Sequence, residues 1–311
     1  MTHATVDTAV AAVDIGGTKT AAALVTASGE VLARTSAPTP GRNGPGAVLQ
    51  AAADLVQRLR TQWAATTVPA VGVGSAGVID AGTGRVLSAT DAIAGWAGTD
   101  LRGELRSRLG LPVGVINDVH AHALGESRQG SGAGEPTVLF MAVGTGIGAS
   151  FVADGRVLAG AHSVAGHAGH QPSPYAAKLT CTCGGRGHLE AIASGPALVA
   201  EYHRRGGTLV SDLREVSTRA AQGDPVAAGV VVLGGAAVGS ALGGLANVLD
   251  PHAVVLGGGV TALGGRWWSA LRDAFRADAL PVLAGIPVRE SALGADAPLV
   301  GAAGLAWELV G

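Results

Sequence analysis

Short apolar runs separated by glycine-containing turns open the chain. Residues 9–13, 21–26 and 31–35 are apolar over strand-like lengths, and small or polar residues lie between them. Runs of this kind, bounded by Gly, Ser and Asp, are typical of strands joined by tight turns. The pattern predicts an antiparallel meander of three strands at the start of the chain.

The same order of elements returns in the middle of the chain. Residues 138–143, 149–152 and 157–158 are apolar, and a glycine turn and an Asp154-Gly155 hairpin turn separate them. Strand, glycine turn, strand, turn and strand therefore occur twice, starting near residues 9 and 138. We interpret this as a weak internal duplication.

Helical and extended patterns alternate after each meander. Apolar spacing predicts helices over 47–63, 101–109 (with Gly110 as the C-cap) and 121–126, and strands over 70–73, 113–116 and 253–256. Alternation of this kind is typical of an α/β fold. Together with the duplication, it predicts two lobes with a cleft between them.

Residues 226–249 carry no charge and are long enough to cross a membrane. The segment is rich in Gly, Ala and Val, and neither a basic cluster nor an aromatic belt flanks it. It also begins with Asp224-Pro225, a typical N-cap followed by Pro at the first helical position. We expect a buried, tightly packed helix rather than a membrane span.

Composition indicates a well-buried globular protein. Of the 311 residues, 48% are hydrophobic and 14% are charged, and the formal net charge of -2 favours neither nucleic acid nor an anionic membrane as a partner. The first ten residues lack the basic flank and long apolar core of a signal peptide. With two cysteines, one residue apart, a disulfide framework is not expected, and the sequence predicts a cytoplasmic protein.

Three predicted strands end in glycine-rich turns, at residues 14–19, 144–148 and 257–259. Glycine permits positive φ and close approach to a ligand, so backbone amides can point at phosphate oxygens. Thr18 and Thr145 add hydroxyl donors, and Asp14 is placed to hold Mg²⁺ directly or through water. One such turn alone would indicate only a hairpin, but three together indicate phosphate binding. None fits a Walker A loop or a dinucleotide fingerprint.

Asn117-Asp118 ends another predicted strand. Phosphoryl transfer to an alcohol needs a carboxylate that accepts the hydroxyl proton and orients the attacking oxygen. Asp118 is a candidate for that base, and the alternative is that it caps the helix that follows.

A compact set of possible metal ligands lies between residues 170 and 188. His170, Cys181, Cys183 and His188 supply two thiolates and two imidazoles, a donor set that suits structural, tetrahedral Zn²⁺. His170 would then serve two purposes, with one ring nitrogen on zinc and the other turned toward a bound substrate. The alternative is two free, reduced cysteines beside unrelated histidines.

These motifs carry a resemblance to a known family. Asp14-Ile15-Gly16-Gly17-Thr18-Lys19 and Gly144-Thr145-Gly146 resemble the two phosphate motifs of actin-like sugar kinases, and Val255-Leu256-Gly257-Gly258-Gly259 resembles the adenosine motif. From about Val10 to its end, the chain is similar to the ROK family of repressors and sugar kinases. Because only thirteen residues precede Asp14, a DNA-binding repressor is not expected.

The resemblance implies a two-lobed, actin-like (ribonuclease H-like) sugar-kinase fold with an interlobe cleft, acting in carbohydrate metabolism. We expect residues 1–117 and a C-terminal helix, 297–311, to form the small lobe. Residues 118–296, with a zinc loop at 170–188, would form the large lobe. The implied cofactors are ATP, Mg²⁺ and structural Zn²⁺, and the matching position makes Asp118 the catalytic base.

The implied site residues fall into two groups. Residues expected to bind ATP and Mg²⁺ are Asp14, Gly16, Gly17, Thr18, Lys19, Gly144, Thr145, Gly146, Gly257, Gly258 and Gly259. Residues expected to bind the sugar are Gly77, Asp91, Asn117, His167, His170 and Glu190. The zinc pattern departs from that of the family, in which His188 is usually a third cysteine.

One further departure bears on the substrate. Glucokinases of the family usually carry Glu where this chain has His167, whereas the Ala-Gly-His-x-Gly-His stretch resembles bacterial N-acetylmannosamine kinases. An imidazole can donate to an amide carbonyl, which a carboxylate would repel. We expect phosphorylation of a primary hydroxyl, the 6-hydroxyl, of N-acetylmannosamine or N-acetylglucosamine. The alternatives are a glucokinase, a non-catalytic sugar-responsive regulator and an ATPase without a sugar acceptor.

The expected partners are sugar, ATP and further copies of the chain in a homodimer or homotetramer.

Overall fold

The structure is a computed structural model that describes residues 7–311. Predictions that concern residues 1–6, among them the lack of a signal peptide, lie outside this range. The described chain forms two units. The first runs to Gly134 and includes Gly155–Ala165 and Ala292–Gly311, and the second comprises Glu135–Asp154 and Gly166–Ser291.

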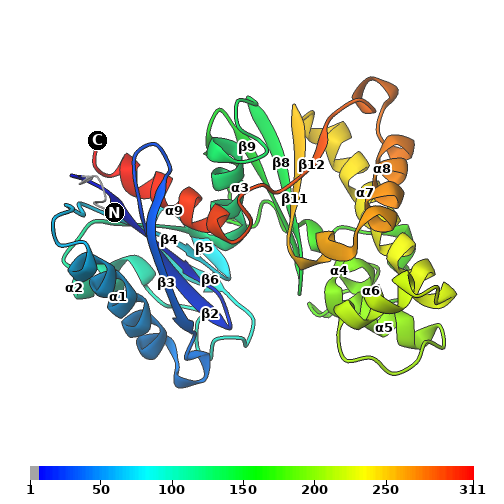
Figure 1. The fold of residues 1–311 in the computed structure, drawn as a ribbon, viewed down its shortest axis with the longest axis horizontal. Coiled ribbons are helices and arrows are strands. Elements are labelled where there is room, and N and C mark those ends of the chain that lie inside the picture. The colour runs from blue at the N-terminus through cyan, green and yellow to red at the C-terminus, as the bar shows by residue number, and fades with distance from the viewer. Residues whose placement is uncertain (1–6) are drawn as a thin grey trace. The chain divides into compact units, whose positions relative to one another are not determined.

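A five-stranded sheet forms the centre of the first unit (Figure 1). Strands β1 (Val10–Ile15), β2 (Lys19–Val25) and β3 (Val31–Pro38) make the predicted antiparallel meander. Strands β4 (Val71–Ser75) and β7 (Val113–Asn117) continue the sheet parallel to β1, in the order β3-β2-β1-β4-β7. The predicted strands of this half are confirmed.

Helices cover both faces of this sheet, so its strands are buried on both sides. Alternate residues such as Ala11 and Val13 share a core with α1 (Pro45–Gln62) and α2 (Leu101–Leu109). Their neighbours Val10 and Ala12 share another core with α9 (Ala297–Glu308). The period-2 alternation of a strand therefore sends successive side chains to different helical layers.

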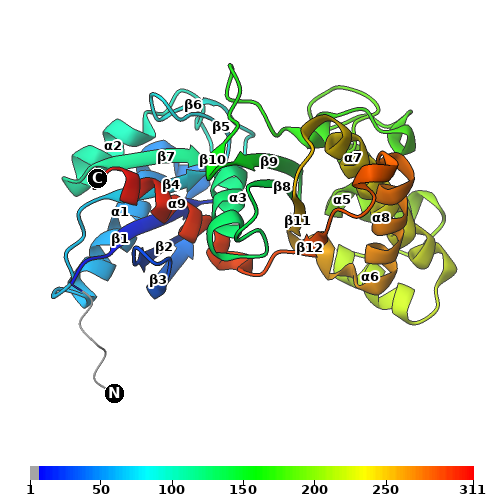
Figure 2. The same ribbon diagram turned by 90° about the horizontal axis from the view of Figure 1, so that it is seen from above.

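Helix α3 (Asp118–Gln129) packs on α9, and the two lie side by side in the first unit (Figure 2). A Cβ atom on Gly301 would overlap the Ala121 carbonyl oxygen, and one on Gly125 would overlap the Ala297 carbonyl oxygen. From the sequence we expected a boundary before residue 118. In the structure the first unit extends to Gly134, because α3 packs against α9.

Glu126 of α3 is a fully buried carboxylate in this layer. It accepts hydrogen bonds from the backbone amides of Ser131 (2.9 Å), Ala292 (3.1 Å) and Leu293 (2.9 Å). These residues lie where the chain leaves the first unit and where it returns. Buried charge requires such donors, so one side chain fixes both segments.

A small hairpin of β5 (Val78–Asp80) and β6 (Arg85–Ser88), which the sequence analysis did not predict, follows β4 in the first unit. Its register shifts between Val78 and Ile79. The runs are too short to stand out in the sequence against the surrounding Gly, Ala and Thr.

The second unit repeats the topology of the first sheet. Strand β8 (Thr137–Val143) pairs antiparallel with β9 (Ile147–Ala153) and parallel with β11 (Ala253–Gly257), as β1 pairs with β2 and β4. The sheet order is β10-β9-β8-β11-β12, with β10 at Arg156–Val157 and β12 at Val288–Glu290. The shared order confirms the predicted duplication.

The uncharged segment forms helix α7 (Pro225–Leu249), and the Asp224 side chain caps it by accepting from the amides of Val226 and Ala227. Among the described residues it is the one helix whose length and apolar composition suit a membrane span, and more than half of its most apolar 18-residue stretch is buried. It packs along α8 (Gly265–Asp278) (Figure 1). Cβ atoms on Gly235 and Gly239 would overlap carbonyl oxygens of α8, so the glycines permit this packing. The predicted buried helix is confirmed.

Shorter helices complete the second unit around one hydrophobic core. They are α4 (Glu190–Ala193), α5 (Gly195–Arg204) and α6 (Leu213–Ala221). The 3-10 helices of the chain lie at Gly41–Asn43, Ala168–His170, Pro174–Ala176, Gly259–Leu263, Pro281–Leu283 and Gly294–Asp296.

Candidate active site

The first glycine turn, Gly16-Gly17-Thr18, joins β1 to β2. The Gly16 amide donates to the Lys19 carbonyl at 3.0 Å, and the Thr39 hydroxyl donates to the Gly16 carbonyl at 2.8 Å. Gly17 lies against Ala92, where an added Cβ atom would come 2.8 Å from the Ala92 Cβ. Side-chain and backbone hydrogen bonds thus fix the shape of the turn.

Asp14 lies on β1 just before this turn and shares the edge of the sheet with Asp118. A Cβ atom on Gly74, in the strand between them, would lie 3.9 Å from the Asp14 Oδ1 and 3.7 Å from the Asp118 Cα. Burial, and then the charge of Asp118, raise the pKa of Asp14 from its ordinary value of 3.8 to about 7, while Lys19 acts in the opposite direction. A nearby cation would favour the charged form of this carboxyl group.

Asn117 and Asp118 lie where β7 passes into α3. Asn117 is the N-cap, and its side-chain oxygen accepts from the amides of Val119 (2.9 Å) and His120 (3.2 Å). Its Nδ2 donates to the Gly77 carbonyl and to the Asp118 Oδ1, both at 2.9 Å. Asn117 is therefore engaged through both its oxygen and its nitrogen, and these bonds orient Asp118.

Gly77 has a φ of 105°, and a Cβ atom there would lie 2.8 Å from the Ser88 carbonyl oxygen. The buried Trp96 donates through Nε1 to the Ala76 carbonyl at 3.1 Å. Asp91 lies nearby in sequence but is exposed. The structure thus brings Gly77 to Asn117 and Asp118, and shows no corresponding contact for Asp91.

His120 and His122 lie on α3 after Asp118. The His120 Nε2 lies 3.1 Å from the Ala165 carbonyl oxygen, to which it donates when that nitrogen carries the proton. Burial lowers the pKa of His122 to about 4, so the ring is neutral near pH 7. His122 therefore adds no positive charge near Asp118 at that pH.

The second glycine turn, Gly144-Thr145-Gly146, joins β8 to β9 in the second unit. Its Gly144 amide donates to the Gly146 carbonyl at 2.9 Å, and the Gly144 carbonyl accepts from the Gly195 amide at 2.8 Å. The next amide, Ile147, donates to the Glu190 Oε2 at 2.8 Å. Glu190 thus contacts the turn directly, and the amides of Thr145 and Gly146 take no part in these bonds.

Positive φ, one reason given for the glycines in these turns, is wrong for most of them. Of the predicted site glycines in the three turns, all of which the structure describes, one has a positive φ: Gly258, with a φ of 92°. A Cβ atom on Gly258 would also overlap the Val143 carbonyl oxygen, whereas one on Gly146 would lie 2.8 Å from the Glu190 Oε2. Close approach of other groups explains Gly146 better than backbone conformation does.

A cavity of about 530 Å³ opens beside the second and third turns, wholly within the second unit. Its volume suits a small organic ligand such as a nucleotide. Of its lining residues, Gly144, Thr145 and Gly259 were predicted from the sequence, and the others lie on α5, on and just before the start of α6, and beside Gly259. The further lining residues are Gly195, Pro196, Val199, Ser211, Asp212, Leu213, Arg214 and Val260.

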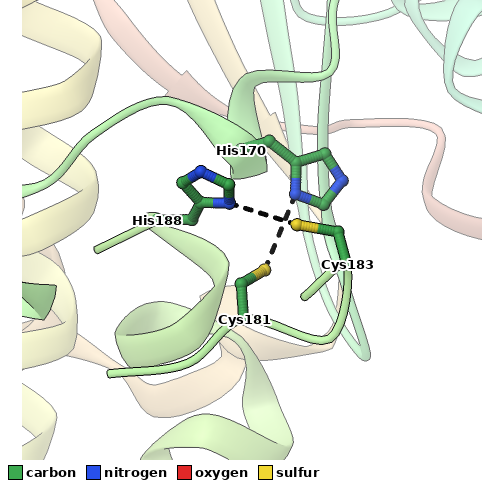
Figure 3. Close-up of side chains that lie close together, drawn as sticks. All are labelled: His170, Cys181, Cys183 and His188. Carbon is green, nitrogen blue, oxygen red and sulfur yellow. Dashed lines mark hydrogen bonds between the residues drawn. The ribbon is translucent and has the colours of Figure 1, made fainter. Parts of the chain in front are cut away.

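The predicted metal ligands converge in the second unit (Figure 3). The ligand atoms of His170, Cys181, Cys183 and His188 all lie within 4.8 Å of one another. The His170 Nδ1 lies 3.6 Å from the Cys181 Sγ, and the His188 Nδ1 lies 3.3 Å from the Cys183 Sγ. Tetrahedral Zn²⁺ with ordinary Zn–N and Zn–S lengths would separate such N and S atoms by about 3.6 Å. The residues therefore fit a zinc ion.

The loop that carries the two cysteines is tightly turned. The Cys181 amide donates to the Gly185 carbonyl at 2.8 Å, and the Gly184 amide donates to the Cys181 carbonyl at 2.9 Å. Burial raises the pKa of the Cys181 thiol, so a bound metal would have to displace its proton. Between the cysteines, the Thr182 hydroxyl donates to the Glu190 Oε1 at 2.8 Å, a contact that the sequence analysis missed.

His167 and His170 lie close together at the start of this region. Their rings are roughly parallel, with centroids 6.2 Å apart and an interplanar angle of 27°. His167 is exposed, while the following residues Ala168 and Gly169 are buried and hold the short helix in place. The predicted sugar residue His167 thus adjoins the predicted metal ligand His170.

Comparison with known proteins places these features in a family. The model of the ROK family matches residues 10–308. The N-acetylmannosamine kinase of Yersinia pseudotuberculosis is 35% identical over 293 residues, which cover 94% of this chain and 96% of that protein. The crystal structure of the ROK hexokinase from Thermus thermophilus superposes with a TM-score of 0.87 at 34% identity, over 97% of this chain and 99% of that one.

A further solved structure was determined with ligands. The ROK family glucokinase from Streptomyces griseus, in complex with glucose and AMPPNP, matches with a TM-score of 0.81 and 33% identity, over 96% of this chain and 99% of that one. The chain has the two-lobed actin-like ATPase fold, and the turns described above occupy the predicted strand ends of both units. The chain belongs to the ROK family and is an ATP-dependent sugar kinase.

Proposed function

We propose that this enzyme transfers the γ-phosphoryl group of ATP to the 6-hydroxyl of an N-acetylhexosamine, either N-acetylmannosamine or N-acetylglucosamine. The observation that carries the choice of sugar is His167, which lies beside His170 at a position where glucokinases of the family usually have Glu. The position of Asp118 supports the proposed chemistry.

In this proposal Asp118 is the catalytic base. Its Oδ1 accepts from the Val119 amide at 2.8 Å and from the Asn117 Nδ2 at 2.9 Å, so the carboxylate is held in one orientation. The alternative role as a helix cap is filled by Asn117. As the sugar hydroxyl attacks phosphorus, Asp118 would accept its proton. Asn117 would contribute chiefly by orienting this carboxylate.

The nucleotide is proposed to bind in the second unit. The cavity beside Gly144, Thr145 and Gly259 has the volume for its base and ribose, and the amides of Thr145 and Gly146 would donate to phosphate. In the first unit, Asp14 is proposed to bind Mg²⁺ through water. The raised pKa of Asp14 supports this role, because a cation is what would keep the buried carboxylate charged near pH 7.

The sugar is proposed to contact Glu190, His167 and His170. Glu190 would accept from sugar hydroxyl groups, and the His167 ring would donate to the acetamido carbonyl. Zn²⁺ on His170, Cys181, Cys183 and His188 would be structural, and would fix the second ring nitrogen of His170 as a donor or acceptor for the sugar. Gly77 and Asp91 are also proposed to contact the sugar.

Glucose is the second candidate substrate. The similarity to the Streptomyces griseus glucokinase favours it as much as the similarity to the N-acetylmannosamine kinase favours an N-acetyl sugar. In a glucokinase, His167 would replace the usual Glu by donating a hydrogen bond to a sugar hydroxyl or accepting one from it.

An assay of ADP release with MgATP separates these candidates. Glucose, mannose, N-acetylglucosamine and N-acetylmannosamine would be compared by kcat/KM, for the wild type and for His167→Glu. We expect the wild type to prefer an N-acetyl sugar and His167→Glu to shift the preference toward glucose by about tenfold or more. A wild type that prefers glucose, with no shift in the variant, would refute the proposed role of His167.

The proposal also includes a cytoplasmic enzyme that assembles as a homodimer or homotetramer. Thiolate ligands for zinc suit a reducing compartment, since oxidation of Cys181 and Cys183 would remove them. Light scattering on the purified protein would measure the assembly directly.

A further inference from the structure

Glu190 connects two features that lie far apart in the sequence. Its Oε2 accepts from the Ile147 amide at the end of the second glycine turn, and its Oε1 accepts from the Thr182 hydroxyl, both at 2.8 Å. Each carboxylate oxygen therefore has one fixed donor. With both bonds made, the plane of the carboxylate is set from two sides.

The Glu190 carboxylate packs closely against the second glycine turn. A Cβ atom on Gly146 would lie 2.8 Å from the Glu190 Oε2, so glycine is needed for the carboxylate to come this close. The Ile147 amide belongs to β9, whose position is fixed by its pairing with β8. The remaining freedom of Glu190 is rotation about this contact, and that freedom is what the second donor removes.

The second donor belongs to the proposed metal loop. Thr182 lies between Cys181 and Cys183, and the surrounding backbone is held by the Cys181–Gly185 and Gly184–Cys181 bonds. Thr is β-branched, so its hydroxyl points where the backbone directs it, with few alternative rotamers. The position of the Thr182 hydroxyl thus depends on how the two thiol groups on either side are held.

We propose that Thr182 is a positioning residue that couples the metal loop to Glu190, and through Glu190 to the second phosphate turn. The inference rests on the proposed function, in which Glu190 binds the sugar and the four Cys and His residues bind zinc. Zinc fixes Cys181 and Cys183, the loop fixes the Thr182 hydroxyl, and the hydroxyl fixes the carboxylate. Loss of the metal would then reach the sugar site through one hydrogen bond, in addition to any effect through His170.

Thr182→Val removes the hydroxyl and keeps the branched shape, whereas Thr182→Ser keeps the hydroxyl. Thr180→Val makes the same change two residues away, at an exposed position outside this contact. We expect zinc content by elemental analysis to be unchanged in all three variants. The sugar Kd, measured by calorimetry with the best substrate of the panel, should rise about tenfold, ~1.4 kcal/mol, in Thr182→Val only.

Amide hydrogen exchange reports the same contact without a sugar. The Ile147 amide should exchange several-fold faster in Thr182→Val than in the wild type, because the carboxylate that accepts its hydrogen bond is no longer held. Zinc removal from the wild type should speed the same amide, and should add little in Thr182→Val, since both act through one bond.

Unchanged Ile147 exchange in Thr182→Val would overturn the inference, as would loss of zinc from that variant, which would make Thr182 part of the metal loop alone. Faster exchange at Ile147 with no change in sugar Kd would support the contact and refute its effect on the sugar. Absence of phosphorylation of every sugar by the wild type would count against the proposed function instead, and the exchange measurement would still decide the role of Thr182.

Discussion

Gly301 of α9 touches the carbonyl group of Ala121 in α3, so that no Cβ atom fits between the two helices at this point. Helix α3 carries Asp118 at its first position, and α9 lies across β1 and β4, the strands that lead to the first glycine turn and to Gly77. The backbone contact therefore sets how the proposed base is held on the sheet.

Gly301→Ala should destabilise the first unit by about 3 kcal/mol, near the upper end of the cost of overpacking, because a methyl group must push two backbones apart. Thermal unfolding would measure the loss. Gly244→Ala makes the same change in α7, where nothing lies within 4 Å of the added Cβ atom. The free energy of unfolding of that control should rise by about 0.5–1 kcal/mol, because Ala has a higher helix propensity than Gly. Equal stability of the two variants would contradict the packing argument.

Asp118→Asn should lower turnover about 10²- to 10⁴-fold, because an amide cannot accept the hydroxyl proton. The Asn side chain can still accept from the Val119 amide, so folding and sugar binding should remain close to those of the wild type. ADP release and sugar calorimetry would give the two quantities separately. Turnover near the wild-type rate would remove Asp118 from the role of base.

Cys181→Ser should release zinc and weaken sugar affinity more than ATP affinity. The hydroxyl of serine is a poor zinc ligand, and the loop that loses order carries Thr182 beside Glu190, whereas other residues line the cavity proposed to bind the nucleotide. Elemental analysis and separate titrations with sugar and with an ATP analogue would test this. A wild-type protein without zinc, or an equal loss of both affinities, would rule out the proposed arrangement.

Asp14→Asn should stabilise the ligand-free protein, in a way that depends on pH. With a pKa of about 7 in the folded state and 3.8 when unfolded, Asp14 lowers stability as pH rises from about 4 to 7, because the unfolded chain loses its proton first. The gain in unfolding free energy of the variant should therefore grow over this range. Above pH 7 it should level off at no more than about 4 kcal/mol.

Asp80→Asn provides a control of opposite sign. The Thr83 hydroxyl lowers the pKa of Asp80, so the charged carboxylate favours the folded state and its removal should cost stability above about pH 4. Chemical unfolding of the three proteins between pH 4 and 8, without Mg²⁺, would measure both effects. If the difference in unfolding free energy between Asp14→Asn and the wild type did not change with pH, burial would not raise the pKa of Asp14 as described.

Elements with strong local signals could be predicted from the sequence. Asp224-Pro225 starts α7 and Gly110 ends α2 in the left-handed conformation, because caps depend on a few neighbouring residues. The duplicated meander was also visible, since the first strand of each copy runs into a glycine turn. The extension of the first unit to Gly134 was not, because it depends on the packing of α3 against α9, which is distant in sequence.

In the candidate site, too, some features could be predicted from the sequence and others could not. The spacing of His170, Cys181, Cys183 and His188 predicted a cluster that the structure brings together. Thr182 carried no signal of its own, because its importance comes from a partner on α4. Gly146 was predicted for the wrong physical reason, since the group that excludes a side chain there is the Glu190 carboxylate.

The order of synthesis gives the contact between α7 and α8 a consequence for folding. A ribosome completes the uncharged α7 before it makes the helix against which Gly235 and Gly239 pack. At ~5–20 residues per second, about thirty further residues take about 2–6 s. During that time the nascent chain presents a 25-residue apolar helix without its partner. Chains that stop before residue 265 would keep that surface uncovered and would be prone to aggregate.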